Sequence, residues 1–383
     1  MEAKKDEQRP FFKPWTFRPA SEIPPRRWLY DAHYIRRYVS TTSAPGGVGK
    51  SALAIIEAMA MASGKPLLGI TPPDRLRVAY WNGEDPLEET ERRIAAAMTH
   101  YGLTKDDLAG WLFWGSGRDD HLIIAHQTRN GAEVLRPNVD RVTVQIRQHV
   151  LDLVILDPFV STHRVTENDN PAIDMVVKEW AAVGDRTDCG IELIHHTRKA
   201  NGSEMSVEDS RGASAFLNAA RSARVLNVMT KEEAERSGVE QRLSYFRVDN
   251  GKANLAPPSE VSAWFRFVSV KLENDPLGPG DSVGVVTPWQ WPNSLDGVKA
   301  ADLLKVQQKI AESEWREDQR SPSWAGYAIA DALGINMDAQ SSKARIKRML
   351  STWLTTGALK RVRRDGPDRK PKQFVEVGNW VEL

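Results

Sequence analysis

Short apolar or β-branched runs alternate with longer amphipathic segments over the first two thirds of the chain. Such runs predict strands, and segments with apolar residues every three or four positions predict helices. The run at 149–159 is almost continuously apolar, which is typical of a strand buried on both faces. We expect strands at residues 38–43, 77–85, 111–115, 149–159 and 190–197, and helices at residues 51–63, 86–102 and 170–189.

Strands that alternate with helices imply an α/β fold with an open, mostly parallel sheet covered on both faces. Three later runs, at 220–228, 244–250 and 263–272, predict strands that are antiparallel at an edge of this sheet. Residues 274–293 are rich in Pro, Gly and Asp, and they indicate a domain boundary.

The last part of the chain has a different pattern. Helical spacing at 298–313, 324–335 and 341–359 is followed by a β-hairpin at 359–377 with a basic tip. In the third of these helices Ile346, Met349, Leu350 and Trp353 lie on one side. Helix, turn, helix and hairpin in this order are the outline of a winged helix.

These patterns divide the chain into four parts. Residues 1–36 form an N-terminal arm, rich in Pro, Arg and Phe, that packs on a neighbouring subunit or is a flexible leader. The α/β domain covers residues 37–273, and residues 274–300 are a linker. The winged-helix domain covers residues 301–383.

Composition narrows the protein class. The 383 residues are 41% hydrophobic and 27% charged, as in an ordinary globular protein. A single cysteine, Cys189, excludes an internal disulfide framework and favours the reducing cytoplasm. The charged N-terminus has no apolar core of a secretory signal, and no run of about 18 apolar residues predicts a membrane span.

The net charge of +1 hides an asymmetry. Residues 341–373 contain 11 Lys or Arg and 2 Asp, so this segment carries +9 and the remainder carries −8. A basic end on a mildly acidic body indicates a nucleic-acid contact, with a solvated tail as the alternative.

The stretch SAPGGVGKSAL at 43–53 matches a phosphate-binding loop between a strand and a helix, except that Ala44 replaces the first glycine. That position requires a tight backbone and makes no phosphate contact, so alanine is tolerable. Glycines let backbone amides turn toward phosphates, Lys50 reaches the β- and γ-phosphates, and Ser51 holds Mg²⁺. The nucleotide-binding residues predicted here are Pro45, Gly46, Gly47, Val48, Gly49, Lys50, Ser51 and Ala52.

Acidic residues complete such a site. Asp157 ends an apolar strand and fits the Walker B carboxylate that binds Mg²⁺. Pro158 follows it, so the general base is not at the next position. We expect Glu84, at the end of a strand beside the loop, to orient and deprotonate the attacking water. Asp85 is the alternative base, or the N-cap of the following helix.

His195 and His196 end another buried strand, and adjacent side chains on a strand point to opposite faces. Only one of them is therefore expected to face the nucleotide and sense the γ-phosphate; the alternative is a core histidine. The sequence has no Cys/His set with the spacing of a zinc site.

Six segments occur in a distinctive order: APGGVGKS, VAYWNGEDP, LVILDP, LIHHTRKA, SRGASAFLNAARSARVL and DNGKANLAPP. Over roughly residues 24–272 this series resembles the RepA-type branch of the RecA/DnaB-like hexameric ATPases of plasmids, phages and mobile elements. The resemblance implies a RecA-like P-loop core that uses ATP and Mg²⁺. It also implies a homo-oligomer, expected as a hexameric ring, in a bacterial cell or phage-infected host.

The resemblance also assigns roles. Lys50 and Ser51 match the Walker A pair, Glu84 the catalytic glutamate, and Asp157 Walker B. His196 matches the γ-phosphate sensor. Arg221 matches the arginine finger that reaches a neighbouring subunit, with Arg211 as a rival, and Lys252 matches a second residue that acts in trans.

Two polar loops, at 161–171 and 198–212, lie where RecA-like proteins contact DNA. Acidic residues in the second loop argue against a strong clamp, and ordinary mobile loops are the alternative. Basic residues of the winged helix are expected to contact phosphates, or the module docks a protein. The candidate DNA contacts are His163, Arg164, Arg198 and Lys199 in the loops, and Lys343, Arg345, Lys347, Arg348, Arg363, Arg364, Arg369 and Lys370 in the module.

The sequence thus favours an oligomeric ATPase that acts on single-stranded or forked DNA, as a replicative-type helicase or helicase loader of a mobile element. The alternative is an ATP-dependent DNA-binding switch that does not unwind, such as a recombination mediator, regulator or defence component. A partition-type ATPase is rejected because Ala44 and Pro45 occupy the place of its second lysine. Nothing resembles the acceptor lid of a small-molecule kinase.

Overall fold

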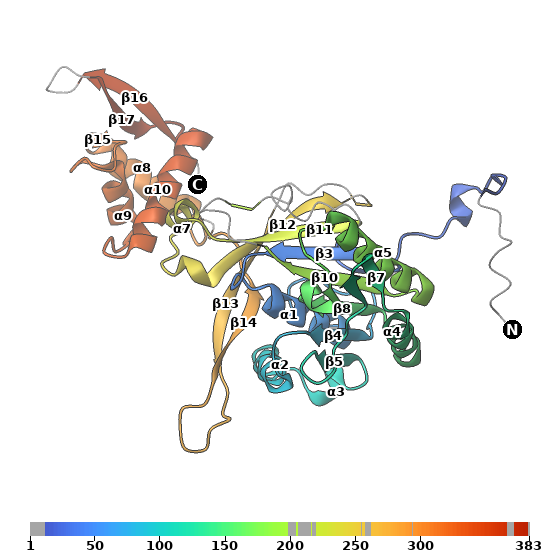
Figure 1. Ribbon diagram of the computed structural model, residues 1–383. Helices are drawn as coiled ribbons and strands as arrows, with labels where there is room; N and C mark the ends of the chain where they lie inside the picture. The colour runs from blue at the N-terminus through green and yellow to red at the C-terminus, as the bar shows by residue number, and fades with distance from the viewer. Residues whose placement is uncertain are drawn as a thin grey trace, which may run out of the picture.

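A nine-stranded sheet forms the centre of the α/β domain (Figure 1). The computed structural model describes residues 12–197, 204–205, 216, 220–253, 255–256, 262–292, 294–365 and 371–381. The strand order is β14-β13-β12-β11-β3-β10-β8-β4-β5. The six strands from β11 to β5 are parallel, and β12, β13 and β14 are antiparallel. The predicted α/β fold with a mostly parallel sheet is confirmed.

The parallel strands are β3 (Val39–Ala44), β4 (Val78–Asn82), β5 (Leu112–Ser116), β8 (Leu153–Asp157), β10 (Gly190–His196) and β11 (Ser222–Val228). The antiparallel strands are β12 (Tyr245–Ala253), β13 (Ala263–Lys271) and β14 (Ser282–Pro288). The helices of this part are α1 (Lys50–Ser63), α2 (Leu87–Tyr101), α3 (Lys105–Leu108), α4 (Arg136–His149), α5 (Asn170–Thr187) and α7 (Lys231–Ser237).

Two hydrophobic cores cover the two faces of the sheet. On one face, α1 and α2 pack on the strands, and Leu53 and Met59 of α1 are fully buried. On the other face, α4 and α5 form the second core around the buried Trp180. Burial along almost the whole length of α1 explains why this helix carries only two charged side chains, Lys50 and Glu57. Gly102 ends α2 in the left-handed conformation, as its sequence predicts.

Several short strands and 3-10 helices lie around the main sheet and its helices, and the sequence pattern did not predict most of them. They are η1 (Ala20–Glu22), β1 (Trp28–Tyr30), β2 (Tyr34–Ile35), β6 (Ala125–Thr128), β7 (Gly131–Val134), η2 (Phe159–Thr162), β9 (His163–Arg164) and η4 (Arg242–Ser244). The hairpin of β1 and β2 belongs to the body, because Tyr30 and Tyr34 are buried in the first core. The predicted arm at 1–36 therefore extends too far into the chain.

Two predictions about strands were wrong. β11 is an interior strand parallel to β3, not an antiparallel edge strand, and its residues are buried on both faces. The expected linker at 274–300 contains β14, which pairs with β13 and extends the main sheet. Most of the Pro, Gly and Asp residues there form the connection from β13 to β14. The composition typical of turns therefore indicates a β-hairpin at this place and not a domain boundary.

The C-terminal part is a separate unit with its own core (Figure 1). Its elements are α8 (Ala300–Ala311), β15 (Trp315–Arg316), α9 (Ala325–Leu333), α10 (Gln340–Thr356), β16 (Leu359–Asp365) and β17 (Pro371–Val377). Ile346, Met349, Leu350 and Trp353 of α10 are buried in this core, on the side that the sequence indicates. No helix in the described part of the chain is long and apolar enough to cross a membrane.

Separate cores predict separate responses to mutation. Trp353→Ala should destabilise the C-terminal unit by about 3–5 kcal/mol, because a large buried side chain is lost from a small core. Hydrogen exchange should show lost protection in residues 294–381 and unchanged protection in β3 and α1. Trp380→Ala, at a side chain that is 53% exposed, is the control and should change little. Equal loss of protection in both units would contradict two separate cores.

Candidate nucleotide-binding site

The P-loop follows β3 at the carboxyl edge of the parallel sheet and leads into α1. Gly47 and Gly49 have φ angles of 80° and 123°. Residues other than glycine adopt such positive φ angles only with backbone strain. A Cβ atom on Gly49 would also lie 2.8 Å from Cζ of Phe267. Glycine is therefore required at position 49 for two independent reasons.

Ala44, the residue that departs from the P-loop pattern, is the last residue of β3. It is fully buried, and its backbone does not have a positive φ. Its methyl group therefore causes no strain. Its carbonyl oxygen accepts a hydrogen bond of 2.7 Å from Nζ of Lys50. Alanine thus fits this position, as the sequence argument expects.

Lys50 is the first residue of α1 and is only 4% exposed. Its ammonium group also donates to the carbonyl oxygen of Pro45 at 2.9 Å. Burial lowers the pKa of Lys50 to about 8, and the nearby charges of Asp157 and Glu84 oppose this shift only partly. A buried cation held by two carbonyl oxygens is suited to receive an anion.

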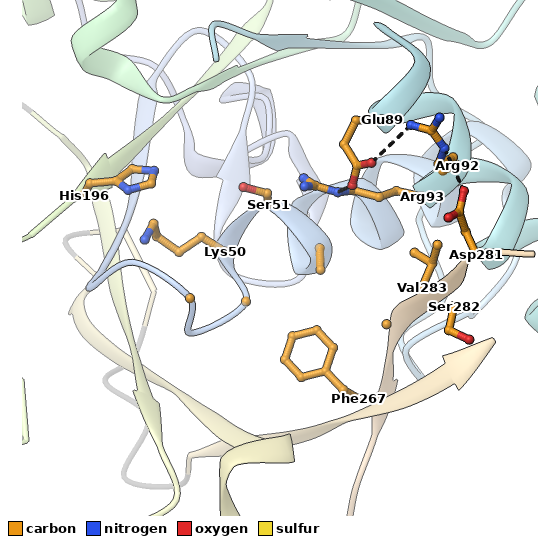
Figure 2. A pocket seen from close by; sticks show the side chains of 14 residues that line it. Lys50, Ser51, Glu89, Arg92, Arg93, His196, Phe267, Asp281, Ser282 and Val283 are labelled. Carbon is orange, nitrogen blue, oxygen red and sulfur yellow. Dashed lines mark hydrogen bonds and ion pairs between the residues drawn. The ribbon is translucent and has the colours of Figure 1, made fainter. Parts of the chain in front are cut away.

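A cavity of about 580 Å³ opens above the P-loop (Figure 2). Its floor contains Lys50, Ser51 and Ala52, and His196 lies beside Lys50 at one end. The opposite wall is made by α2 and by the hairpin of β13 and β14.

That wall was not predicted from the sequence. Arg92 and Arg93 reach in from α2, and Phe267 and Val283 come from β13 and β14. Arg92 pairs with Asp281 at 3.1 Å, which joins α2 to the hairpin. The sequence gives no signal for these contacts beyond the apolar pattern of β13, because they depend on which strands pair. Both arginines also pair with Glu89, which lines the same wall, so their charges are balanced within the chain. The ring of Phe267 offers an apolar face to a nucleotide base.

Asp157 ends β8 and is 1% exposed. Its Oδ2 atom accepts a hydrogen bond of 2.7 Å from the hydroxyl of Tyr80, which fixes the carboxylate at the edge of the sheet. In the neighbouring strand Asn82 lies opposite Asp157. The side-chain oxygen of Asn82 accepts from the backbone amides of Glu84 and Asp85 at 2.9 and 2.6 Å. Asn82 thus holds the turn that carries the expected general base.

The Glu84 side chain is exposed at this turn. Its strand, β4, does not lie beside β3 as expected, because β10 and β8 come between them. The turn nevertheless places the Glu84 carboxylate within electrostatic reach of Lys50 and His196. The expected N-cap role of Asp85 was wrong: Pro86 occupies that position, and the Asp85 carboxylate pairs with Arg93 at 3.1 Å.

The two histidines at the end of β10 diverge, as adjacent residues on a strand do. His196 lines the cavity (Figure 2), and burial together with the charge of Lys50 lowers its pKa. His195 lies on the opposite face, with its ring 5.0 Å from that of Phe216. Burial lowers the pKa of His195 to about 4, so it stays neutral near pH 7.

Arg221 is exposed and immediately precedes β11. Its backbone amide donates to the carbonyl of Val39, the first residue of β3, at 2.9 Å. It therefore lies at the amino edge of the sheet, whereas the P-loop lies at the carboxyl edge. The length of β3 separates the two by roughly 16 Å. Arg221 is not part of the P-loop site of its own chain.

Several predicted contacts lie outside the described residues. These are Arg198, Lys199, Arg211, Arg369 and Lys370, and the side chain of Lys252. In the loop after Asp157, Arg164 is exposed. His163 is buried against Phe159, where burial lowers its pKa to about 4, so its expected contact with a DNA phosphate was wrong.

The basic residues of the C-terminal unit are not equivalent. Lys343 and Lys347 on α10 are exposed, and so is Arg363 on β16. Arg345 is different, because it donates to the carbonyl oxygens of Ser294 and Asp296.

Arg348 donates to the carbonyl oxygen of Arg236, in α7. Burial and the nearby Arg345 lower the pKa of Arg348. Arg364 pairs with Glu314 and Glu376. Arg345, Arg348 and Arg364 are thus engaged within the chain.

Comparison with known proteins shows the family to which the chain belongs. A family model described as an AAA domain matches residues 6–202, about half of the chain, and this range contains the P-loop and the ends of β4, β8 and β10. The chain belongs to the AAA domain family. Among solved structures it is similar to the RadB recombinase, with 14% identity, a TM-score of 0.39, and coverage of 61% of this chain and 89% of that chain.

An AAA domain of the P-loop type binds ATP, and the residues present fit this ligand. Gly47 and Gly49 leave room for phosphates, and Lys50 supplies the buried cation. Bound Mg²⁺ would neutralise phosphate charge, and Ser51 with Asp157 would hold it. Within the described residues, no cluster of three His, Cys, Asp or Glu is arranged for a metal.

The pKa of Lys50 yields a test of this site. Folding lowers that pKa from its usual 10.5 to about 8, so between these values the unfolded chain binds more protons and the stability contributed by this group rises with pH. ATP binding instead requires the charged form. The affinity for ATP should therefore fall between pH 8 and pH 10, by up to about tenfold per pH unit, with proton uptake on binding.

Titration calorimetry in buffers with different ionisation enthalpies measures both quantities. Lys50→Arg is the matched control, because a guanidinium stays charged across this range and should remove the pH dependence. Constant affinity of the unmodified protein from pH 8 to pH 9.5 would contradict the buried, partly neutral Lys50.

Proposed function

We propose that this AAA-domain protein is an oligomeric, Mg-ATP-hydrolysing motor that acts on DNA. In this proposal it works as a replicative-type helicase or helicase-loader-like ATPase of a plasmid, phage or other mobile element. The location of Arg221 carries the proposal: it is exposed and lies at the edge of the sheet remote from its own P-loop. An arginine in this place is available to the nucleotide of a neighbouring subunit.

Within one subunit the expected roles are distributed along the carboxyl edge of the sheet. Lys50 and the P-loop amides bind the phosphates, and Ser51 and Asp157 hold the metal ion. Glu84 orients and deprotonates the attacking water, and His196 contacts the γ-phosphate. Arg221 of an adjacent copy supplies positive charge as the phosphate leaves. A ring, expected to be hexameric, repeats this shared site around its axis.

The C-terminal unit is proposed to be a winged-helix module that binds DNA. The element order α8, β15, α9, α10 and the β16–β17 hairpin supports this assignment. The exposed cations on α10 and β16 are its best candidates for phosphate contacts, whereas Arg345, Arg348 and Arg364 would first have to leave partners within the chain.

The proposed module predicts a specific salt dependence. Replacing Lys343, Lys347 and Arg363 together by Gln should weaken DNA binding at least tenfold near 0.1 M salt. It should also reduce the salt slope of log K by about 2–3, because up to three phosphate contacts are lost. The control is Arg361→Gln on the same hairpin, where the guanidinium pairs with Glu317 at 2.9 Å. Fluorescence anisotropy across a salt series measures both variants, and equal slopes for both would contradict a phosphate-binding module.

Strand displacement on a forked duplex tests the motor itself. With ATP and Mg²⁺ the unmodified protein should release the labelled strand. Glu84→Gln should bind ATP and DNA but release none, because water is no longer activated. Hydrolysis of ATP without strand release would instead identify an ATP-dependent DNA-binding switch, such as a recombination mediator, regulator or defence component.

A further inference from the structure

A buried polar cluster lies beneath the sheet, on the face that α1 covers. It joins five parts of the chain: the β1–β2 hairpin, α1, β3, β10 and β11. All of its side chains are almost inaccessible to solvent. The members of the buried cluster are His33, Tyr34, Ser40, Thr42, Glu57, Glu192, Ser222 and Arg224.

Arg224 on β11 uses every nitrogen of its guanidinium group. Nη1 and Nη2 donate to the two oxygens of Glu57 at 2.7 and 2.6 Å, which is the bidentate geometry of a strong ion pair. Nη2 also donates to the hydroxyl of Tyr34 at 3.0 Å, and Nε donates to the hydroxyl of Thr42 at 2.8 Å. β11 is thus fastened to α1, to β3 and to the N-terminal hairpin by one side chain.

Glu192 on β10 forms the other half of the cluster. Its two oxygens accept hydrogen bonds from Thr42, at 2.5 Å, and from Ser40. His33 lies 3.1 Å from the same carboxylate through Nε2, and its Nδ1 atom is 3.0 Å from the hydroxyl of Ser222. β10 is thereby fastened to β3 and to the N-terminal hairpin.

Thr42 connects the two halves. Its hydroxyl accepts from Arg224 and donates to Glu192, so one oxygen on the P-loop strand links β11 with β10. Thr41, the preceding residue, is equally buried, but its hydroxyl has no hydrogen-bond partner among the described residues. The neighbours Thr41 and Thr42 therefore differ in their bonds and not in their burial.

Burying two carboxylates and a guanidinium is costly, and apolar residues of similar size often stabilise a core as well or better. A cluster of this kind is favoured where a fixed geometry is needed, because a fully satisfied network permits one arrangement. Its strands and helix all lead to residues of the proposed ATP site. β3 and α1 carry the P-loop, β10 ends at His196, and β11 begins next to Arg221.

We propose that the buried cluster is a positioning device that fixes β11, and with it Arg221, to the P-loop strand and helix. Arg221 is only three residues from Arg224, so a shift of β11 against α1 moves the finger. The two halves of the shared site, the P-loop facing one neighbour and Arg221 facing the other, are thereby held in one rigid frame. This inference rests on the proposed function, in which Arg221 acts on the ATP of an adjacent subunit.

The experiment separates a positioning role from general stability by using two kinds of subunit. Lys50→Ala subunits keep Arg221 but cannot use ATP, and Arg221→Ala subunits keep the P-loop but lack the finger. Each alone should be inactive. An equal mixture should recover up to about a quarter of normal turnover, because one interface in four pairs an intact P-loop with an intact finger.

Thr42→Val is then added to the Lys50→Ala subunit only, which contributes the finger and not the reacting ATP. Recovered turnover should fall at least fivefold, with KM for ATP unchanged, because the P-loop in use belongs to the other subunit. Thr41→Val in the same subunit is the matched control and should leave recovery intact. Sizes of the mixed assemblies and melting temperatures are measured in parallel.

A second matched pair covers the case in which Thr42→Val does not fold. Tyr34→Phe removes one hydroxyl that accepts from Arg224 and donates to Glu57, at 2.5 Å. Tyr30→Phe removes a buried hydroxyl that has no partner within the described residues. Tyr34→Phe should lower recovery, and Tyr30→Phe should not.

The outcomes are distinct. Equal recovery with the members of each pair overturns the positioning role and leaves the shared site standing. No recovery from the unmodified mixture overturns the shared site, and the positioning role falls with it.

Discussion

The central strand β3 is buried on both faces, although four of its six residues carry hydroxyl groups. Buried hydroxyl groups are stabilised by hydrogen-bond partners, and β3 finds them on one face only, because the hydroxyls of Thr41 and Ser43 have no partner among the described residues. On the face covered by α1, Ser40 and Thr42 bond to Glu192 and Arg224. The pairs that satisfy β3 come from the strands on its two sides, so the order β11-β3-β10 is fixed by polar contacts as well as by the backbone ladder. The P-loop begins where this strand ends, and its geometry therefore depends on the same contacts.

The sequence predicted what local chemistry determines. The glycines of the P-loop, the largely apolar α1, the end of α2 at Gly102 and the carboxylate of Asp157 at the end of β8 all appear where their patterns place them. It did not predict features that depend on the pairing of distant strands. The interior place of β11 and the ring of Phe267 above Gly49 both arise from sheet order, which no short pattern encodes. The Arg224–Glu57 pair also escaped notice, because an isolated arginine in a strand resembles a surface residue.

The C-terminal unit shows how one helix serves two purposes. The apolar side of α10 builds the third core, and a second side packs on the end of α7. A Cβ atom on Gly238, which ends α7, would lie 3.0 Å from Cα of Ser341. A side chain at Gly238 would press on the backbone of α10, and Arg348 bonds to α7 close by. The cations that remain exposed therefore lie on the rest of α10 and on β16. A count of basic residues in the sequence thus gives a larger basic surface than the structure leaves open to DNA.

Arg221 and the P-loop occupy opposite edges of one sheet, and a rigid domain cannot bring them together. If Arg221 acts on ATP, a second copy must present it, and the spacing between neighbours then follows from the distance between the two edges. If β11 could shift, that spacing would vary, because a displacement of Arg221 would add to any displacement of the neighbour's P-loop. Dispersion forces alone allow a strand and a helix to slide by small amounts, whereas the bidentate pair of Arg224 and Glu57 has one favourable register. A charged contact in the core is thus reasonable where a neighbouring active site depends on the position of a strand end.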